Sequence, residues 1–455
     1  AVSKAPVSGR IILGFHGAPS KPINHPDIFD PPPTFAWDIH DWKPGESIVL
    51  DRSNALCWQG DLDSLDGWYG VQAALKTNRK ARGLNAPGNA VTTRSVVFIE
   101  KGEMCRPLDM LFNVTPGAPK KFKESEFVKE VNIKSALLAR FYGEPDSIRA
   151  AVVLPLSYFE GKDRLYPSVY VMGGWGSTHF DALADFQQKR YGMSGFGEEK
   201  IFVFINGECR SGYHVFCSSE TNGPREETLF QELIPFVEKE YRVDRNPGTR
   251  FLMGQSTGAW ASLWLLLAYP DRFGGVYAGS PDPVDFTEFC GTNIYERNAN
   301  MFFDSNGGLK CFSGGGSAKD GPPGVTVKDF VMCDRIAGWG EQMYSFDATF
   351  SRKGKDGEPR HLFDWSTGTV DPEVAASWES HDLSKVVSGM DRKTRSALNG
   401  KIHIYVADND PFGLDRPVRA FQKVLTKKGV EADIRYLTNA GHAVWTDDLR
   451  KSMHE

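Results

Sequence analysis

The sequence lacks the features that mark nucleic-acid-binding and membrane-spanning proteins. Its net charge is −5, and charges of both signs are mixed along all 455 residues. A phosphate backbone requires a clustered basic face, which such mixing does not provide. Apolar runs such as residues 264–268 are far shorter than the roughly 20 residues of a membrane span. We therefore expect no nucleic-acid partner and no transmembrane helix.

Signatures of metal and nucleotide sites are absent as well. The histidines show no H-E-x-x-H spacing, and the glycines show no G-x-G-x-x-G spacing. The seven cysteines form no C-x-x-C pair, which argues against a zinc knuckle or a redox motif. A metal set of His179, His214 and a carboxylate has no recognisable ligand spacing. We expect neither a metal nor an organic cofactor.

The cysteines leave two interpretations of the cellular compartment. Cys209 and Cys217 flank a short loop and could be bridged, and three others share one irregular region. Disulfides are typical of exported proteins, and a chain that begins at Ala1 fits the removal of an export signal. Buried free thiols are the alternative. We expect a secreted or periplasmic protein with disulfides.

Residues 1–124 are predicted to form an N-terminal β-sandwich-like domain. Short β-rich runs, such as residues 9–15 and 95–99, alternate with Pro- and Gly-rich turns, and helical periodicity is missing. This part contains four tryptophans, Trp37, Trp42, Trp58 and Trp68. We expect them to pack in a core, since buried aromatic rings dominate core energetics. An aromatic platform for glycans is the alternative.

Residues 125–455 change to alternating strands and helices, which predicts a mostly parallel sheet with helices on both faces. Residues 284–396 interrupt this alternation with short helices and without a strong strand. Ligand-binding loops leave a parallel sheet at the carboxyl ends of its strands. We therefore expect this insert to form a cap or lid on the active-site side.

Residues 254–258 read G-x-S-x-G, between a strand-length apolar stretch and a buried helix. This context is typical of the nucleophile elbow, a sharp turn that exposes the Oγ of its serine above a sheet. The flanking glycines leave room for that turn. Ser256 is the predicted nucleophile.

A serine nucleophile needs a base, and the base needs a carboxylate that orients it. The predicted strand at residues 432–437 runs into a loop that contains His442, the expected base. The strand at residues 401–407 runs into an acidic turn that contains Asp408 and Asp410. We prefer Asp410 as the acid, because three residues separate it from the strand end, and Asp408 is the competitor.

The tetrahedral intermediate requires hydrogen-bond donors for its oxyanion. One is expected to be the backbone N–H of Thr257, directly after the nucleophile. The other is expected from the Gly-rich loop at residues 173–177, with Trp175 first and Gly174 next. After the strand at residues 201–206, Glu208, Arg210 and His214 are candidate substrate-binding residues, with surface roles as the alternative.

With these motifs the chain resembles the esterase D-like branch of the α/β-hydrolases, and its β-rich leader resembles enterochelin esterase-type proteins. The similar segments are residues 166–174, 231–235 and 253–280, the last containing Y-P-D-R-F. The family's His-Gly-Gly turn has Gly173 in place of His here, and the elbow reads S-T-G-A instead of S-M-G-G. The resemblance implies an α/β-hydrolase fold and a serine triad of Ser256, Asp410 and His442.

The predicted function is therefore a serine carboxylic-ester hydrolase that acts through an acyl-enzyme on a small-molecule or polysaccharide-linked ester. An acyltransferase or a serine peptidase with the same triad is one alternative. A peptidase of the prolyl-oligopeptidase kind usually carries a propeller, for which residues 1–124 are too short. A non-catalytic glycan-binding protein on a hydrolase fold is the second alternative.

Overall fold

The computed structural model describes residues 5–17, 28–29, 31–84, 86–104, 107–115, 120–161, 163–190, 193, 199–313 and 324–452. Two compact units divide the chain. We call the first, which comprises Ala1–Lys121, Cys209–Gly212 and Lys328–Tyr344, the sheet unit. The remaining residues form the larger unit.

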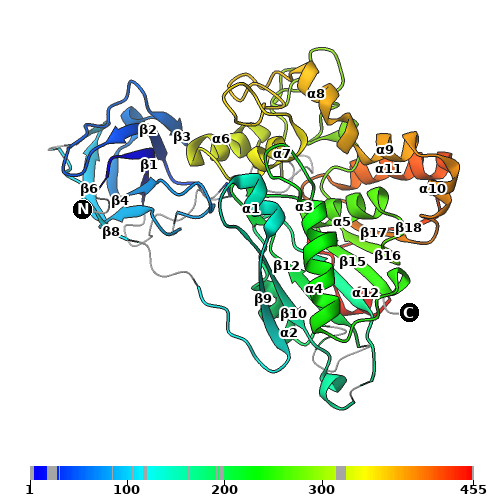
Figure 1. Ribbon diagram of the computed structural model, residues 1–455. Coiled ribbons are helices and arrows are strands. Elements are labelled where there is room, and N and C mark those ends of the chain that lie inside the picture. The colour runs from blue at the N-terminus through cyan, green and yellow to red at the C-terminus, as the bar shows by residue number, and fades with distance from the viewer. Residues whose placement is uncertain are drawn as a thin grey trace. The chain divides into compact units, whose positions relative to one another are not determined.

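The sheet unit is built on antiparallel strands (Figure 1). They are β1 (Val7–His16), β2 (Thr34–Trp42), β3 (Leu56–Trp58), β4 (Gly67–Lys76), β5 (Ala90–Thr92), β6 (Ser95–Glu100), β7 (Glu103–Met104) and β8 (Phe112–Val114). The long strand β4 pairs with β1 along one edge and with both β5 and β6 along the other. The prediction of a β-rich N-terminal domain is confirmed as an antiparallel sheet.

The four tryptophans of this unit have different environments. Trp37 and Trp58 are buried, at 6% and 3% exposure, as the core interpretation predicts. Trp42 is half-buried and its ring meets that of Phe112 edge-on. Trp68 is 64% exposed and lies directly across from Phe98 on the neighbouring strand. For Trp68 the core prediction is wrong, because its side chain points to the outer face of β4.

One helix of the predicted insert packs in the sheet unit. It is α6 (Val327–Ala337), whose Cys333 and Ile336 pack with Ile12 of β1. Lys76 is buried at its C-terminal end and donates hydrogen bonds to the carbonyls of Ala337 and Trp339, at 3.0 and 2.6 Å. A cation at this end of a helix is favourable, because the last carbonyls carry partial negative charge.

The larger unit contains an eight-stranded sheet in the order β18-β17-β16-β15-β11-β12-β10-β9. The strands are β9 (Val128–Lys134), β10 (Ser147–Val153), β11 (Ser168–Met172), β12 (Ile201–Ile205), β15 (Arg250–Gln255), β16 (Gly275–Gly279), β17 (Ile402–Ala407) and β18 (Ala432–Leu437). Strand β10 is antiparallel to both of its neighbours, β9 and β12. The other neighbouring pairs of this sheet, among β12, β11, β15, β16, β17 and β18, are parallel. This is the predicted α/β-hydrolase fold.

Helices cover both faces of this sheet. Outside α6, the described residues contain the helices α1 (Ala136–Tyr142), α2 (Asp181–Gln187), α3 (Arg225–Thr228), α4 (Ile234–Glu240), α5 (Thr257–Ala268), α7 (Gln342–Phe350), α8 (Pro372–Trp378), α9 (Leu383–Gly389), α10 (Arg392–Ser396), α11 (Asp415–Lys428) and α12 (Asp447–Ser452). In Figure 1, α3, α4 and α5 lie in front of the sheet. Alternation along β15 explains the two layers: Gly254 faces α5, whereas Met253 packs with Ala182 of α2 on the opposite face.

Within the described ranges, no helix combines the length and the apolar character that a membrane crossing requires.

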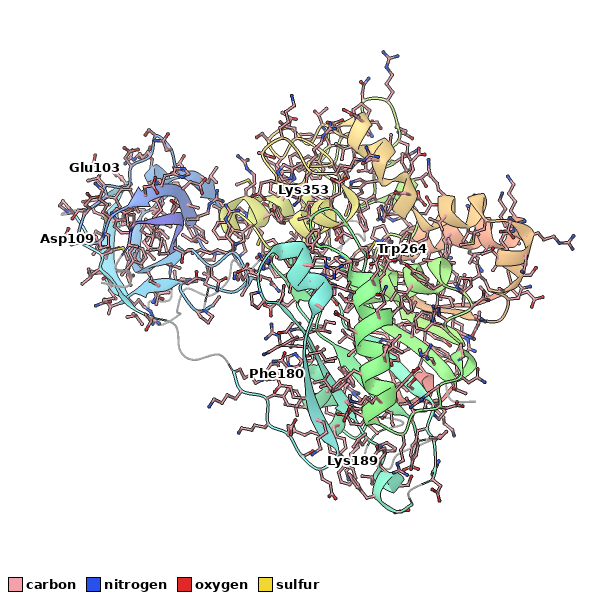
Figure 2. The ribbon with its side chains drawn as sticks, viewed as in Figure 1. Glu103, Asp109, Phe180, Lys189, Trp264 and Lys353 are labelled. Carbon is pink, nitrogen blue, oxygen red and sulfur yellow. The ribbon has the colours of Figure 1, made fainter. Side chains whose placement is uncertain are left out.

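Residues of the insert that belong to the larger unit are anchored on α5 by aromatic rings. The ring of Phe350 lies 4.9 Å from that of Trp260 and 5.0 Å from that of Trp378. His381 lies 5.3 Å from Trp264, the α5 residue labelled in Figure 2. Residues 284–396, predicted to form a cap or lid, supply α6 to the sheet unit and an aromatic layer over α5.

The prediction of disulfides is not supported. The six cysteines that the structure describes are free thiols, and Cys105 lies outside the described residues. Cys209 Sγ lies 3.2 Å from the hydroxyl of Ser211, and Cys217 Sγ donates to the carbonyl of Ser218 at 3.7 Å. Each of these two thiols therefore has a local polar partner instead of a bridge. The secreted or periplasmic location therefore stays a prediction, without support from disulfides.

Candidate active site

Ser256 occupies the turn between β15 and α5 in a strained conformation. Its backbone angles are φ 55° and ψ −124°, a region that costs a non-glycine residue roughly 1–3 kcal/mol. Backbone hydrogen bonds hold it there: its N–H donates to Gly279 O at 2.9 Å, and its carbonyl accepts from Ala259 N at 2.9 Å. The surrounding fold therefore imposes the geometry of a nucleophile elbow.

The two glycines of the G-x-S-x-G motif are sterically required. A Cβ on Gly254 would lie 2.2 Å from the carbonyl oxygen of Gly258. A Cβ on Gly258 would lie 2.0 Å from the carbonyl oxygen of Met172 on β11. Both distances are far below van der Waals contact, so close packing of α5 against the sheet explains the motif.

The loops after β17 and β18 bring His442 and Asp410 together. His442 Nδ1 lies 3.0 Å from Asp410 Oδ2. The Asp410 side chain is fully buried, whereas that of His442 is 23% exposed. A carboxylate only accepts hydrogen bonds, so Nδ1 carries the proton and Nε2 is left as the basic nitrogen. Asp408, the competing acid, is exposed.

One hydrogen bond places the His442 loop beside the elbow. Gln255, which precedes Ser256, donates from Nε2 to the carbonyl of His442 at 2.8 Å. The imidazole also meets the ring of Phe412 edge-on, with centroids 4.7 Å apart. Gln255 and His442 are 187 positions apart in the chain, and this hydrogen bond holds both at the same end of the sheet.

The hydroxyl of Ser256 donates to Asp282 Oδ1 at 3.1 Å, a partner that the sequence analysis missed. Asp282 follows β16, and its other oxygen accepts from Thr257 Oγ1 at 2.5 Å. A usable signal was present, because an acidic residue after the strand next to β15 must lie near the nucleophile. The same argument holds for the turn after β17, which contains Asp408 and Asp410.

The predicted oxyanion loop passes next to Ser256. A Cβ on Gly174 would lie 3.3 Å from Ser256 Cβ, which leaves little space for a side chain. Gly176, at φ +79°, closes a turn in which Ser177 N–H donates to Gly174 O at 3.0 Å. The ring of Trp175 lies 6.0 Å from that of Tyr213.

Thr257 is the first residue of α5, where backbone N–H groups point out of the helix end. It directly follows Ser256, the serine of the motif. Its side-chain hydroxyl is directed to Asp282.

Among the three predicted substrate-binding residues, His214 is buried, at 6% exposure. Its Nδ1 accepts from Phe216 N–H at 3.0 Å, and its Nε2 lies 3.3 Å from Asn206 O. Burial and the charge of Arg225 hold its pKa well below the usual value. This neutral histidine orders its loop. Glu208 and Arg210 are half-buried in the segment after β12.

The sheet order, the strained serine and the histidine–carboxylate pair after the last two strands place the protein among the α/β-hydrolases. The model of the putative esterase family matches residues 145–444, which is more than half of the chain. The chain belongs to this family.

Solved structures with a similar arrangement are distant in sequence. A ferulic acid esterase shares 16% identity at a TM-score of 0.42, over 72% of this chain and 94% of that one. An S-formylglutathione hydrolase from Agrobacterium tumefaciens shares 13%, with a TM-score of 0.41, over 73% and 94%. A fluorophosphonate-binding serine hydrolase from Staphylococcus aureus shares 13%, at a TM-score of 0.41, over 72% and 96%. None of the curated proteins matches the chain.

Proposed function

We propose that the protein is a serine carboxylic-ester hydrolase. Ser256 is the nucleophile, His442 the general base, and Asp410 the carboxylate that orients the imidazole. The backbone N–H groups of Thr257 and Trp175 hold the oxyanion, with Gly174 allowing the close approach of its loop. Membership of the putative esterase family supports an ester as the substrate.

The proposed reaction proceeds through an acyl-enzyme. His442 Nε2 takes the proton of the Ser256 hydroxyl as Oγ bonds to the ester carbon, and the negative charge moves to the carbonyl oxygen. When the tetrahedral intermediate collapses, the imidazolium gives that proton to the leaving alcohol. Water then enters and gives a proton to His442 as its oxygen bonds to the acyl carbon, and the imidazolium returns that proton to Ser256 Oγ as the acid leaves.

The observation that carries this proposal is the hydrogen bond between His442 Nδ1 and Asp410 Oδ2 beside a strained serine. Free imidazole interconverts between two tautomers, and only the one with a basic Nε2 serves this reaction. A buried carboxylate on Nδ1 selects that tautomer before substrate arrives. The strain at Ser256 keeps its hydroxyl at the end of the sheet instead of in a helix cap.

A fluorophosphonate probe tests the nucleophile directly. The folded protein is expected to label at Ser256, whereas Ser256→Ala keeps its fold and loses both labelling and hydrolysis of p-nitrophenyl esters. Ser396→Ala is a matched control, because Ser396 is exposed on α10 and bonds only the carbonyl of Arg392 among the described contacts. A folded protein that does not label, or labels at another residue, would overturn the proposal.

The acyltransferase and peptidase alternatives share this nucleophile and are separated by the second substrate. A panel of p-nitrophenyl esters is compared with peptide p-nitroanilides of matched size. Added alcohols are then offered as competitors of water. The proposal expects ester cleavage with water as the acceptor; preferential cleavage of anilides, or transfer to the alcohol in place of hydrolysis, would replace it.

A further inference from the structure

Tyr213 is a large buried residue that contacts the predicted oxyanion loop, residues 173–177. It lies on β14 (Gly212–Tyr213), which follows β12 in the chain, and it is 1% exposed. Its hydroxyl donates to the carbonyl oxygen of Gly173, the first residue of the loop. Because the ring of Trp175 also lies 6.0 Å from that of Tyr213, the loop meets this side chain at two positions. A buried phenol needs a hydrogen-bond partner, and this one has found it on the loop.

The ring of Tyr213 fits against a glycine. A Cβ on Gly207 would lie 2.3 Å from Tyr213 Cε2, so a side chain at position 207 would displace the ring. Gly207 comes two residues after the end of β12, and β12 lies beside β11 in the sheet. The phenol is therefore held at the carboxyl ends of these two strands, where the oxyanion loop begins.

The carbonyl of Gly173 is itself closely packed. A Cβ on Gly258, two residues after Ser256, would lie 2.3 Å from Gly173 O. Position 173 has no room for a side chain either, because a Cβ there would lie 2.2 Å from Ser177 Cβ. The loop therefore has no side chain of its own at its first residue, and the backbone carbonyl is the group that Tyr213 holds.

Holding this carbonyl fixes the peptide plane that leads to the proposed oxyanion donors. A trans peptide is planar, so the Gly173 carbonyl and the Gly174 N–H point in opposite directions within one plane. A Cβ on Gly174 would lie 3.3 Å from Ser256 Cβ, so this plane ends beside Ser256. A rotation of the plane would therefore displace the N–H groups of Gly174 and Trp175 from an oxyanion formed at Ser256.

The predicted insert holds Tyr213 by its backbone. Tyr213 N–H donates at 3.1 Å to Oγ of Ser345, which lies on α7 and is 1% exposed. Just after Tyr213, the buried residues Val215 and Phe216 have φ of 51° and 52°. This region is unfavourable for residues other than glycine, so the surrounding fold must impose it. The segment that carries the phenol is thus fixed in one conformation.

We propose that Tyr213 is a positioning residue for oxyanion stabilisation. Its hydroxyl holds the Gly173 peptide so that the loop N–H groups meet the oxyanion, and Ser345 of the insert anchors its backbone. This inference rests on the proposed function, because it needs an oxyanion formed at Ser256. It adds a residue outside the triad and the oxyanion loop, and it gives α7 a role in the reaction.

Tyr213→Phe removes the donor and keeps the ring. On p-nitrophenyl esters, kcat should fall by about tenfold, less than the roughly 10²–10³ that loss of an oxyanion donor itself costs. KM should change by less than about twofold, because acylation and deacylation both pass through an oxyanion and slow together. A trifluoromethyl ketone forms a serine adduct that carries the same oxyanion. Its inhibition constant should rise by the factor by which kcat falls, a match that a merely structural role would not produce.

Tyr166→Phe is the matched control. Tyr166 is fully buried, and its hydroxyl lies 2.8 Å from Ser157 Oγ, so this substitution also removes one hydroxyl contact from a packed phenol. Tyr166 precedes β11, at the opposite end of that strand from Gly173. Its kcat and its inhibition by the trifluoromethyl ketone should stay native. Thermal denaturation shows whether each variant is folded.

Ser345→Ala provides the test if Tyr213→Phe does not fold. It removes the acceptor of the Tyr213 N–H, and kcat should fall by about threefold with KM unchanged, the scale of one net hydrogen bond.

A native kcat in folded, fluorophosphonate-labelled Tyr213→Phe, or in Ser345→Ala where it replaces that variant, would overturn this inference and leave the proposed function intact. An equal loss of kcat in Tyr166→Phe would overturn it as well. A native protein that neither labels nor hydrolyses any ester would remove the proposed function itself.

Discussion

Asp410 and His442 are joined by a 3.0 Å hydrogen bond across 32 residues of chain, and the buried partner is the carboxylate. Because that carboxylate is shielded from water, its hydrogen bond to Nδ1 is stronger than an exposed one would be. This hydrogen bond indicates that Asp410, and not Asp408, supports the proposed base His442.

Asp410→Asn is expected to lower kcat on p-nitrophenyl esters by a factor on the order of 10²–10⁴, because an amide can donate to Nδ1 and stabilise the wrong tautomer. Asp408→Asn should change kcat less than about threefold, since Asp408 is exposed. Steady-state kinetics on both purified variants make the comparison. A larger loss in Asp408→Asn would transfer the acid role to that residue.

Gly258→Ala should destabilise the protein by more than about 2 kcal/mol, since the new Cβ would lie 2.0 Å from Met172 O in a packed interior. Gly389→Ala is the control: nothing lies within 4 Å of the added Cβ, at the end of α9. That substitution should be neutral or stabilising by about 0.4–1 kcal/mol. Urea denaturation measures both, and equal stabilities would contradict the packing explanation of the motif.

His381 should make the folded state sensitive to acid. Burial lowers its pKa from 6.5 to about 4, so the folded protein binds fewer protons than the unfolded chain between these values. Its contribution to stability is present above pH 6.5 and is lost as the pH falls toward 4. His381→Phe preserves the ring contacts with Trp264 and Phe350 and removes the titration. The free energy of unfolding should fall less steeply with acid in the variant; parallel curves would exclude His381 as the cause.

Trp37 and Trp68 should differ sharply when each is replaced by alanine. Trp37 is 6% exposed and its Nε1 donates to Asp51 O at 2.9 Å, so its loss should cost about 3–5 kcal/mol. Trp68 is 64% exposed and shares only a cross-strand ring contact with Phe98, at 5.2 Å, among its described ring pairs. Its loss should cost about 1 kcal/mol or less. Chemical denaturation followed by circular dichroism distinguishes the two, and similar costs would contradict the assigned environments.

Much of the fold was predictable because its signals are local. The alternation of strand and helix after residue 125 follows from apolar periodicity, and the elbow at Ser256 from five consecutive residues. His442 was found because a loop after the last strand of a parallel sheet must lie at the end where ligands bind. These features depend on strand order and direction, which the sequence pattern carries.

Other features required coordinates. Asp408 and Asp410 share one turn, and the pattern favours neither strongly; the path of the backbone buries one and exposes the other. The packing of α6 in the sheet unit includes the hydrogen bond from Lys76 to the carbonyl of Ala337, which is 261 residues away in the chain. Burial of such a cation becomes favourable only when helix and sheet meet.

By itself, then, the sequence determined the alternation of strands and helices, the turn that holds Ser256 and the histidine that we propose as the base, because short-range sterics and periodicity specify them. Only the tertiary structure decided that Asp282 contacts Ser256, that His214 is an internal residue and that the six described cysteines are thiols. Those outcomes depend on distances between segments far apart in the chain, which packing sets and local pattern does not contain.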